Sequence, residues 1–202
     1  MAEAQTFEQK FRALVEKDAI RDVIYRYCRA VDRCDRELMK ACYWPDARDN
    51  HGFYSGNAHA FADYVIPVLE QALSTTHAIS NVILELDGDR ACGESYVHVT
   101  HRLVRPDGTL VDNKSNCRYI DLFERRSGEW KILFRAAVAD TMYDEPVVSY
   151  ADLAALGPLL ETAPRAVHGK GDPAYLGFDA RALDKPDFAM TDFWNAVVGR
   201  KT

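Results

Sequence analysis

Two polar residues interrupt otherwise apolar patterns in this sequence, and together they could transfer a proton. Asp32 ends the helical segment CRAVD, and His77 stands where a strand is predicted to begin. A neutral imidazole accepts a proton, and a neighbouring carboxylate fixes its tautomer and stabilises the imidazolium that forms. Taken singly, such residues usually have structural roles, as a solvated helix end or a packed strand histidine. As a pair they predict a general-base dyad that abstracts a proton beside a carbonyl or an aromatic system.

Two further candidates lie on predicted strands. Alternation places His98 with Tyr96 and Thr100 on one face, and His101 with Val97 and Val99 on the other. We predict that His101 lines a pocket, because a histidine flanked by valines would be unusual on an exposed face. Arg118 could bind a carboxylate, a phenolate or an oxyanion from within the cavity. The structural alternative for Arg118 is a cross-strand ion pair with a glutamate.

Asp32 is expected to lie at the end of a helix. Apolar residues recur at steps of three and four through the opening segment and again after residue 58, as in amphipathic helices. Asp35 is placed to cap the second helix, Pro45 to end it, and Pro67 lies inside the third. We therefore predict helices over Thr6–Asp32, Arg36–Cys42 and Ala58–Leu73, with a short strand over Ala47–Asn50.

Strands follow from residue 76 onward. Alternating β-branched and aromatic residues are separated by the turn signals DGD, PDG and SG, and these short connections predict antiparallel hairpins. Helices followed by a meander predict an α+β fold with the helices packed on one face of a curved sheet. The predicted strands are Val82–Leu86, Ala91–Leu103, Leu110–Glu124 and Trp130–Val138.

Composition narrows the classes of partner. The chain has 202 residues, 48% of them hydrophobic, with a net charge of −6 and a pI near 5.5, which argues against binding nucleic acid or an anionic membrane. It shows no long apolar run and no signal-peptide pattern, so we expect a cytoplasmic protein. The five cysteines lack CxxC spacing and predict reduced thiols without a metal site. A small-molecule partner, or another copy of the chain, is expected.

Several separated motifs resemble the SnoaL-like family of the nuclear transport factor 2-like superfamily. They are IRDVIYRYCRAVD at residues 20–32, the PDA at 45–47, the TH at 76–77 and FERRSGEWKI at 123–132. The family includes scytalone dehydratase, hexachlorocyclohexane dehydrochlorinase and bile-acid 7α-dehydratase. The resemblance spans Phe7 to Tyr143 and implies a cone-shaped α+β fold with N-terminal helices over a curved, mostly antiparallel sheet.

The resemblance also implies roles for individual residues. Asp32 and His77 match the family's catalytic aspartate and histidine, and Tyr27 falls where relatives place a tyrosine or lysine that contacts substrate. Asn50 or His51 would contact substrate from a strand that lines the pocket in relatives. The alternatives are a core aromatic for Tyr27 and turn residues for Asn50 and His51.

We therefore expect a SnoaL-like domain over residues 1–143, with 144–202 as an extension that closes the site or contacts another subunit. The expected activity is a cofactor-independent elimination, dehydration first, on a small aromatic or polycyclic substrate. Carbon–carbon cleavage that releases formaldehyde, isomerisation or cyclisation, and a non-catalytic small-subunit or binding module are the alternatives. A homodimer or homotrimer is expected.

Overall fold

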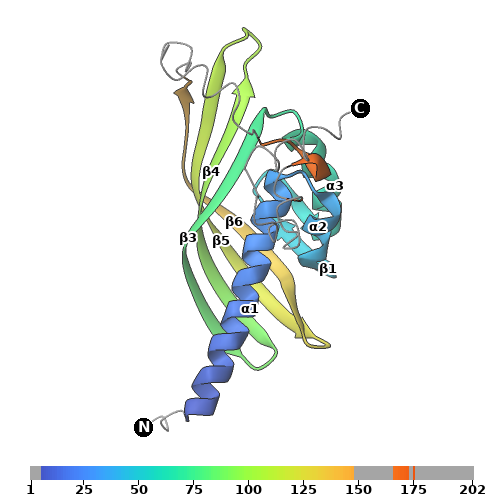
Figure 1. Ribbon diagram of the computed structural model, residues 1–202, viewed down its shortest axis with the longest axis vertical. Helices are drawn as coiled ribbons and strands as arrows, with labels where there is room; N and C mark the ends of the chain where they lie inside the picture. Colours follow the sequence, from blue (N-terminus) through green and yellow to red (C-terminus); the bar gives the residue numbers. More distant parts are fainter. Residues whose placement is uncertain (1–5, 148–165, 173–174, 176–202) are drawn as a thin grey trace, which may run out of the picture.

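The computed structural model of the chain describes residues 6–147, 166–172 and 175, and it forms an α+β fold (Figure 1). Three α-helices come from the first 69 residues, and long strands dominate from residue 74 onward. The elements are α1 (Phe7–Asp32), α2 (Arg36–Ala41), β1 (Tyr43–Asn50), β2 (Ser55–Asn57), α3 (Ala58–Leu69), β3 (Ser74–Asp87), β4 (Arg90–Val104), β5 (Leu110–Arg126), β6 (Glu129–Pro146) and the 3₁₀ turn η2 (Gly169–Gly171).

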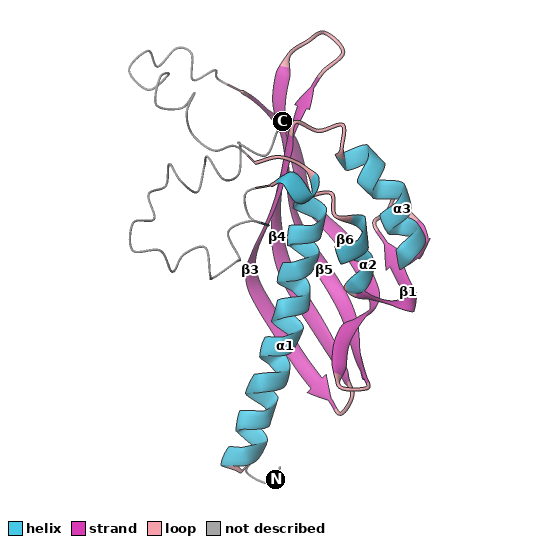
Figure 2. Ribbon diagram, turned by 45° about the vertical axis from the view of Figure 1, so that its right-hand side comes forward, coloured by secondary structure: helices cyan, strands magenta, loops and turns pink. Residues whose placement is uncertain are grey.

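Six strands form one sheet in the order β2-β1-β6-β5-β4-β3. The predicted meander of β3 to β6 is confirmed, since each of these strands pairs antiparallel with the next. The pairing of β1 with β6 is parallel and was not predicted. Helices α1, α2 and α3 lie on the same side of this sheet (Figure 2). The space between that face and the helices is where the candidate site forms.

Local signals fix both ends of α1. Thr6 and Gln9 form a reciprocal capping box at its start, because each side chain bonds the other's backbone N–H. At its end Cys34 adopts a left-handed backbone with φ 51°, and the backbone N–H of Asp35 turns back to the carbonyl of Ala30 at 2.8 Å. The Asp35 carboxylate then accepts from the backbone of α2, as predicted. This tight turn holds the last turn of α1 against the sheet.

The boundaries of several elements differ from the predictions. Strand β1 begins at Tyr43 rather than Ala47, because Tyr43 already pairs with Ile132 and the register then shifts around Pro45. Helix α3 ends at Leu69, and β3 begins at Ser74, so His77 lies inside a strand longer than predicted. Strands β4 to β6 extend beyond the single alternating segments that the sequence indicates.

Two irregularities in β6 change which side chains face the helices. Phe123 pairs with Ile132 while Leu122 pairs with Phe134, so Leu133 is an extra residue. A single extra residue reverses the alternation of the strand. Beyond it Arg135 is buried and Phe134 is 37% exposed. A second shift, at Asp140, lies further along the same strand.

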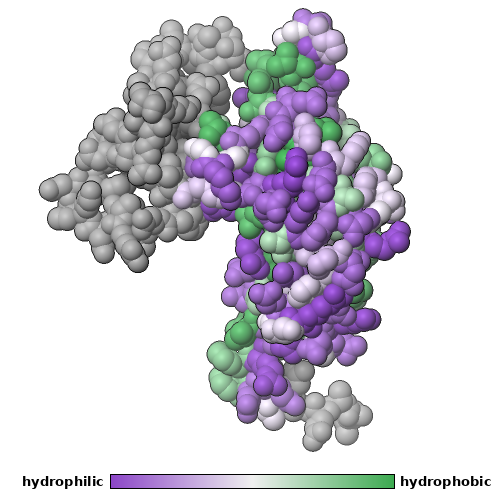
Figure 3. Space-filling view, turned by 90° about the vertical axis from the view of Figure 1, so that its right-hand side faces the viewer, coloured by the Kyte–Doolittle hydropathy of each residue, from purple (hydrophilic) through white to green (hydrophobic). Residues whose placement is uncertain are grey.

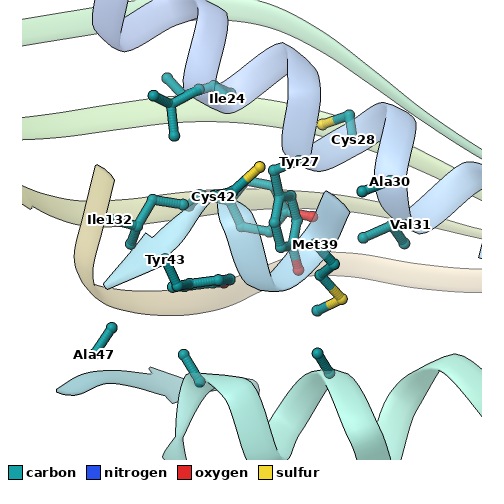
Figure 4. Packing of buried hydrophobic residues seen from close by; sticks show 14 of the residues in the cluster. Ile24, Tyr27, Cys28, Ala30, Val31, Met39, Cys42, Tyr43, Ala47 and Ile132 are labelled. Atoms are coloured by element: carbon teal, nitrogen blue, oxygen red, sulfur yellow. The ribbon is translucent and has the colours of Figure 1, made fainter. Parts of the chain in front are cut away.

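The core lies between α1, α2, α3 and the sheet. Figure 4 shows Tyr27 of α1, Tyr43 of β1 and Ile132 of β6 in one packed layer, each at most 2% exposed. Cys28, Cys34 and Cys42 are buried there as free thiols, as predicted for packing. The side of the molecule seen in Figure 3 is mainly hydrophilic where it is coloured, which fits apolar side chains turned inward.

The first half of α1 is different, because its apolar residues are exposed. Phe7, Phe11, Leu14 and Val15 are between 51% and 84% exposed, and burial begins only at Ile20. The N-terminal end of α1 reaches past the ends of the strands (Figure 1). The expected homodimer or homotrimer stays a prediction.

Most of the C-terminal extension lies outside the described residues, so its predicted role in closing the site or contacting another subunit is untested. Its described part packs at the junction of α1 and α2: Arg33 pairs with Asp172 at 2.9 Å, and the Tyr175 hydroxyl donates to Asp35 at 2.7 Å. Within the described part of the chain, no helix is long and apolar enough to span a bilayer.

Candidate active site

A cavity of about 520 Å³ opens between α1, α3 and the inner face of the sheet. Its wall is mainly aliphatic and aromatic, with rings contributed by Phe53, Phe61, Tyr64 and other residues. Three histidines and one serine interrupt this wall, together with the hydroxyls of its tyrosines, and among the described residues no Asp, Glu, Lys or Arg side chain lines it. An apolar cavity with a few polar groups is the usual form of a small-molecule site.

The structure brings Asp32 and His77 into direct contact. The carboxylate uses both oxygens on the same residue: Oδ1 lies 2.7 Å from Nδ1 of the ring, and Oδ2 accepts the backbone N–H of His77 at 3.0 Å. This arrangement fixes the ring against the end of α1. With Nδ1 bound to the carboxylate, Nε2 is the nitrogen left for the cavity, which His77 lines.

Asp32 does not line the cavity but a second, smaller groove behind His77, which it shares with Arg29 and Arg33. The His77 ring separates the two spaces, since it borders both. A carboxylate at a helix C-terminus meets the negative end of the helix dipole, and the two arginines counter that repulsion. The acid is therefore placed to orient the histidine rather than to touch a molecule in the cavity.

His101 of β4 lies beside His77 in the cavity wall, with the ring centroids 5.5 Å apart in an edge-to-face arrangement. Burial, and to a smaller extent the neighbouring His77, lower the pKa of His101 to about 4, although the charge of Asp32 opposes the shift. His101 is thus neutral at physiological pH. Its Nδ1 is buried and has no hydrogen-bond partner among the described residues. The face that alternation favoured for His101 is the face on which the structure places it.

Tyr27 lines the cavity one turn before the dyad and is 2% exposed. Its ring packs edge-on against Tyr43 and Tyr119. Burial raises the pKa of Tyr27 well above its ordinary value, although the charge of Arg135 opposes the shift, so the hydroxyl keeps its proton. Tyr27 is therefore a core aromatic whose hydroxyl is also available as a hydrogen-bond donor at the cavity wall. The two interpretations given for it from the sequence, core packing and substrate contact, are compatible.

A buried ion pair supports these tyrosines, and the sequence patterns did not reveal it. Arg135 donates to both oxygens of Asp121 at 2.7 Å, with both side chains fully buried. The guanidinium lies between the rings of Tyr27 and Tyr119, 4.1 and 3.9 Å from their centroids. Burial raises the pKa of Asp121, and the charge of Arg135 opposes that rise. The pair locks the aromatic floor of the cavity in place.

A second aspartate–histidine contact lies on the other side of the cavity. His51 follows β1 and lines the cavity, and its Nδ1 makes a short contact with Oδ1 of the fully buried Asp49. The Tyr43 hydroxyl donates to the other oxygen of Asp49 at 2.6 Å. Sequence analysis selected His51 but missed Asp49. The spacing of two residues in an extended segment was the available signal, because such residues point to the same side.

Two candidate site residues, Arg118 and Asn50, do not line the cavity and instead have the structural roles that were their alternatives. Arg118 faces the opposite side of the sheet and pairs with Asp140 at 3.0 Å and with Glu94 at 3.6 Å. Its strand neighbours Cys117 and Tyr119 point into the cavity instead. Asn50 is exposed, and its side chain accepts the backbone N–H of Gly52 at 3.0 Å, so it forms the turn that orients His51. Within the described part of the chain, no three metal-ligating side chains are grouped.

The family model of the SnoaL-like domain matches residues 12–136, which is more than half of the chain. The chain belongs to the SnoaL-like family. Its fold is that of the nuclear transport factor 2-like superfamily. The sequence has no significant match among curated proteins.

Solved structures with the same fold align with this chain over most of their own length. A Novosphingobium aromaticivorans protein assigned provisionally as a scytalone dehydratase aligns with a TM-score of 0.58 and 22% identity over 68% of this chain and 92% of its own. Hexachlorocyclohexane dehydrochlorinase LinA-type3 from Novosphingobium barchaimii has a TM-score of 0.58 and 20% identity, over 69% and 95%. Rv3472 from Mycobacterium tuberculosis, whose function is unknown, has a TM-score of 0.55 and 24% identity, over 74% and 89%. At these identities the likeness establishes the fold of the SnoaL-like domain.

Proposed function

We propose that the protein is a small-molecule lyase in which His77 acts as the general base and Asp32 orients it. The contact of 2.7 Å between Nδ1 of His77 and Oδ1 of Asp32 carries this proposal. A separate orienting acid, a ring with one free nitrogen and an apolar cavity are the features that general-base catalysis requires. The names of the dehydratase and dehydrochlorinase neighbours support elimination as the reaction type.

In the proposed reaction, Nε2 of His77 removes a proton from a carbon beside a carbonyl or aromatic group. The electrons of the broken C–H bond form a double bond, and a group on the neighbouring carbon departs with its own bonding electrons. The imidazolium of His77 then returns the proton to the departing group, so hydroxide leaves as water and the base is restored. Asp32 stabilises the charged ring between these two steps. The elimination is redox-neutral, so these steps call for no redox cofactor.

The cavity favours a substrate with one or two rings. Its volume of about 520 Å³ lies within the range of ligand sites, roughly 300 to 1,000 Å³, and its wall is rich in aromatic rings. Dehydration is the first reaction we propose. Loss of formaldehyde by carbon–carbon cleavage needs the same proton transfer from a different atom, a hydroxyl, and is the second.

A non-catalytic binding module needs no acid behind a cavity histidine. The direct contact within the dyad and the lowered pKa of His101 beside it, about 4, therefore support an enzyme over such a module. An isomerase would use the same dyad without losing a group. Product mass separates an isomerase from a lyase.

The test is to incubate the purified protein with a panel of hydroxylated one-ring and two-ring aromatic compounds and to weigh the products by mass spectrometry. We expect a product lighter by water, or by formaldehyde, with wild type and with His98→Gln. His98 is the matched control, because it lies on the outer face and contacts Asn116 at 2.8 Å. His77→Gln and Asp32→Asn should give no product. A product of unchanged mass would replace the lyase by an isomerase, and turnover that survives in both dyad variants would refute the mechanism.

A further inference from the structure

We propose that His51, held by Asp49, is a cationic hydrogen-bond donor for a substrate oxygen conjugated with the carbon that His77 deprotonates. The inference rests on the proposed function and adds the substrate class, a ketone or a phenol whose oxygen lies at the His51 end of the cavity. His51 directly follows β1 and His77 lies on β3, and these two strands are separated by three others in the sheet. The two histidines therefore meet a ligand from different sides.

The orientation of His51 is fixed from several directions. Asp49 holds Nδ1, and the backbone N–H of His51 donates to the carbonyl of Tyr54 at 2.9 Å. The ring stacks on Phe61 with a centroid separation of 4.4 Å and an interplanar angle of 23°. Because Nδ1 is engaged by Asp49, Nε2 is the nitrogen available to the cavity that the ring lines. A ring held this firmly presents its donor at one position in the wall.

The charge balance around Asp49 favours a cationic ring. Asp49 is fully buried, and a buried carboxylate needs a matching positive charge. The nearby guanidinium of Arg135 is already matched by Asp121 in a bidentate pair. Tyr43 contributes a neutral hydroxyl bond to Asp49. The imidazole of His51 is thus the group placed to balance the charge of Asp49.

The aromatic rings that contact His51 are uncharged, and the charged pair Arg135–Asp121 lies behind them. Phe53 and Phe61 contact the ring from the β1–β2 turn and from α3, and Tyr119 contacts it from β5. Burial raises the pKa of Tyr119 well above its ordinary value, so its hydroxyl stays neutral. In the part of the chain that the structure describes, no lysine or arginine lines the cavity, and His101 is neutral. Among the described residues that line the cavity, His51 is therefore the one suited to bind an oxyanion.

The two pairs then divide one reaction between them. When His77 takes the proton from carbon, the electrons of the C–H bond form a carbon–carbon double bond, and the electrons of the carbonyl double bond move to its oxygen. That oxygen accepts the N–H of His51 as its negative charge develops. On collapse of the enolate the oxygen electrons re-form the carbonyl, and the electrons of the enolate double bond form a new double bond to the carbon that carries the leaving group. That group departs with its own bonding electrons, and His77 returns its proton to it. For a phenol with the leaving group on a conjugated side chain, the phenolate first expels that group with its electron pair and becomes a quinone methide. His77 then takes the neighbouring C–H proton, the electrons of that bond form the side-chain double bond and restore the phenolate, and His51 donates to its oxygen.

Equilibrium binding of 4-nitrophenolate tests the inference without any turnover. The anion resembles the charged intermediate, its absorbance reports binding, and nitrobenzene is the neutral control of similar shape. Wild type should bind 4-nitrophenolate more tightly than nitrobenzene. His51→Gln and Asp49→Asn should weaken the binding of 4-nitrophenolate by about 10- to 100-fold, as expected for a lost charged hydrogen bond. The binding of nitrobenzene should change little. His98→Gln, which changes a histidine outside the cavity, should bind the anion as wild type does.

Several outcomes would overturn the inference. Equal affinity of wild type for the anion and nitrobenzene would do so, as would unchanged anion binding in a folded His51→Gln variant. Loss of anion binding in His77→Gln instead would assign the oxygen to the other histidine. If the His51 and Asp49 variants do not fold, ¹⁵N NMR of wild type decides: both ring nitrogens of His51 should carry protons at pH 7, and a neutral ring contradicts the proposal.

A binding result of this kind is separate from the lyase reaction. Failure of the panel to give products, with intact anion binding at His51, would remove the proposed function and keep the oxyanion site. Product formation without preference for the anion would do the reverse. To distinguish the two sources of oxygen, cyclohexenone and phenol are compared as ligands, because a ketone site and a phenol site share the same donor but differ in ring planarity.

Discussion

Replacing Asp32 by asparagine should invert the tautomer of His77. The carboxylate accepts the backbone N–H of His77 with Oδ2 and faces Nδ1 with Oδ1. An asparagine keeps the backbone bond only if its carbonyl takes the Oδ2 position, which turns its NH₂ group toward Nδ1. In the opposite orientation the NH₂ group would face the backbone N–H of His77, and placing these two donors against each other costs about 1 to 3 kcal/mol. The favoured orientation makes Nδ1 an acceptor and places the proton on Nε2, where it blocks proton uptake from a substrate.

The expected loss is therefore large in rate and small in stability. The rate constant kcat should fall by about 10³- to 10⁴-fold, or about 4 to 5.5 kcal/mol, the scale seen when an orienting carboxylate is lost in other proton-transfer sites. Binding of substrate should change little, because Asp32 does not line the cavity. Asp63→Asn is the control, since Asp63 is a half-exposed surface residue paired with Lys40. Its kcat should equal that of wild type.

Two assays follow this variant. Single-turnover kinetics on a substrate found in the panel measure the rate, and ¹⁵N NMR of the imidazole nitrogens measures the tautomer without substrate. The reasoning predicts that the proton moves from Nδ1 to Nε2 of His77. A folded Asp32→Asn variant with kcat within tenfold of wild type, or with the proton still on Nδ1, would refute it.

Three further predictions concern stability. Gly93→Ala should cost about 1 to 3 kcal/mol on thermal denaturation, because its Cβ would lie 2.9 Å from the Phe123 ring. Arg135→Met should cost about 3 to 5 kcal/mol in urea, because it leaves Asp121 buried without its cation, and adding Asp121→Leu should recover part of the loss. The lowered pKa of His101 should make the free energy of unfolding fall by at most about 3 kcal/mol between pH 6.5 and about 4, and His101→Gln should flatten that fall.

The sign of the last effect follows from proton uptake. The unfolded chain binds a proton on His101 near pH 6.5, and the folded chain binds it only near pH 4. Unfolding is therefore favoured as pH falls through this window, and the stability present above pH 6.5 is lost. A Gly93→Ala variant as stable as Gly171→Ala, an Arg135→Met variant as stable as wild type, or an unchanged pH profile in His101→Gln would each contradict its prediction. Gly171 is the control because its nearest neighbour would lie 3.9 Å from an added Cβ.

The parts of the site on regular elements were predictable from the sequence. His101 lies on β4, which pairs with β5 without a register shift, so simple alternation identified its face. Asp32 is at the end of a helix with a clear apolar period, and the family resemblance paired it with His77. The order of the meander followed from turn signals such as Ser127-Gly128, which adopt the left-handed backbone of a tight hairpin turn.

The remaining parts depend on irregularities that alternation cannot anticipate. Arg135 would face outward if β6 alternated from Ile132 onward, but the extra residue Leu133 turns it into the core. Asn50 was a candidate because it lies at the end of a strand that lines the pocket in relatives. Its side chain instead accepts a hydrogen bond within the local turn. Arg118 forms a cross-strand ion pair, which was its structural alternative, but the main partner is Asp140 rather than a glutamate. Cross-strand pairing decided the positions of Arg135 and Arg118, and a local turn decided that of Asn50.

The most direct test of the central claim compares His77→Gln with His98→Gln in single-turnover experiments on a substrate from the panel. Both variants remove one imidazole from the sheet, but only His77 lines the cavity and contacts Asp32. The account predicts that His77→Gln loses at least about 10³-fold in rate while His98→Gln keeps the rate of wild type. A His77→Gln variant that turns over substrate within about tenfold of wild type would show that this histidine is not the base.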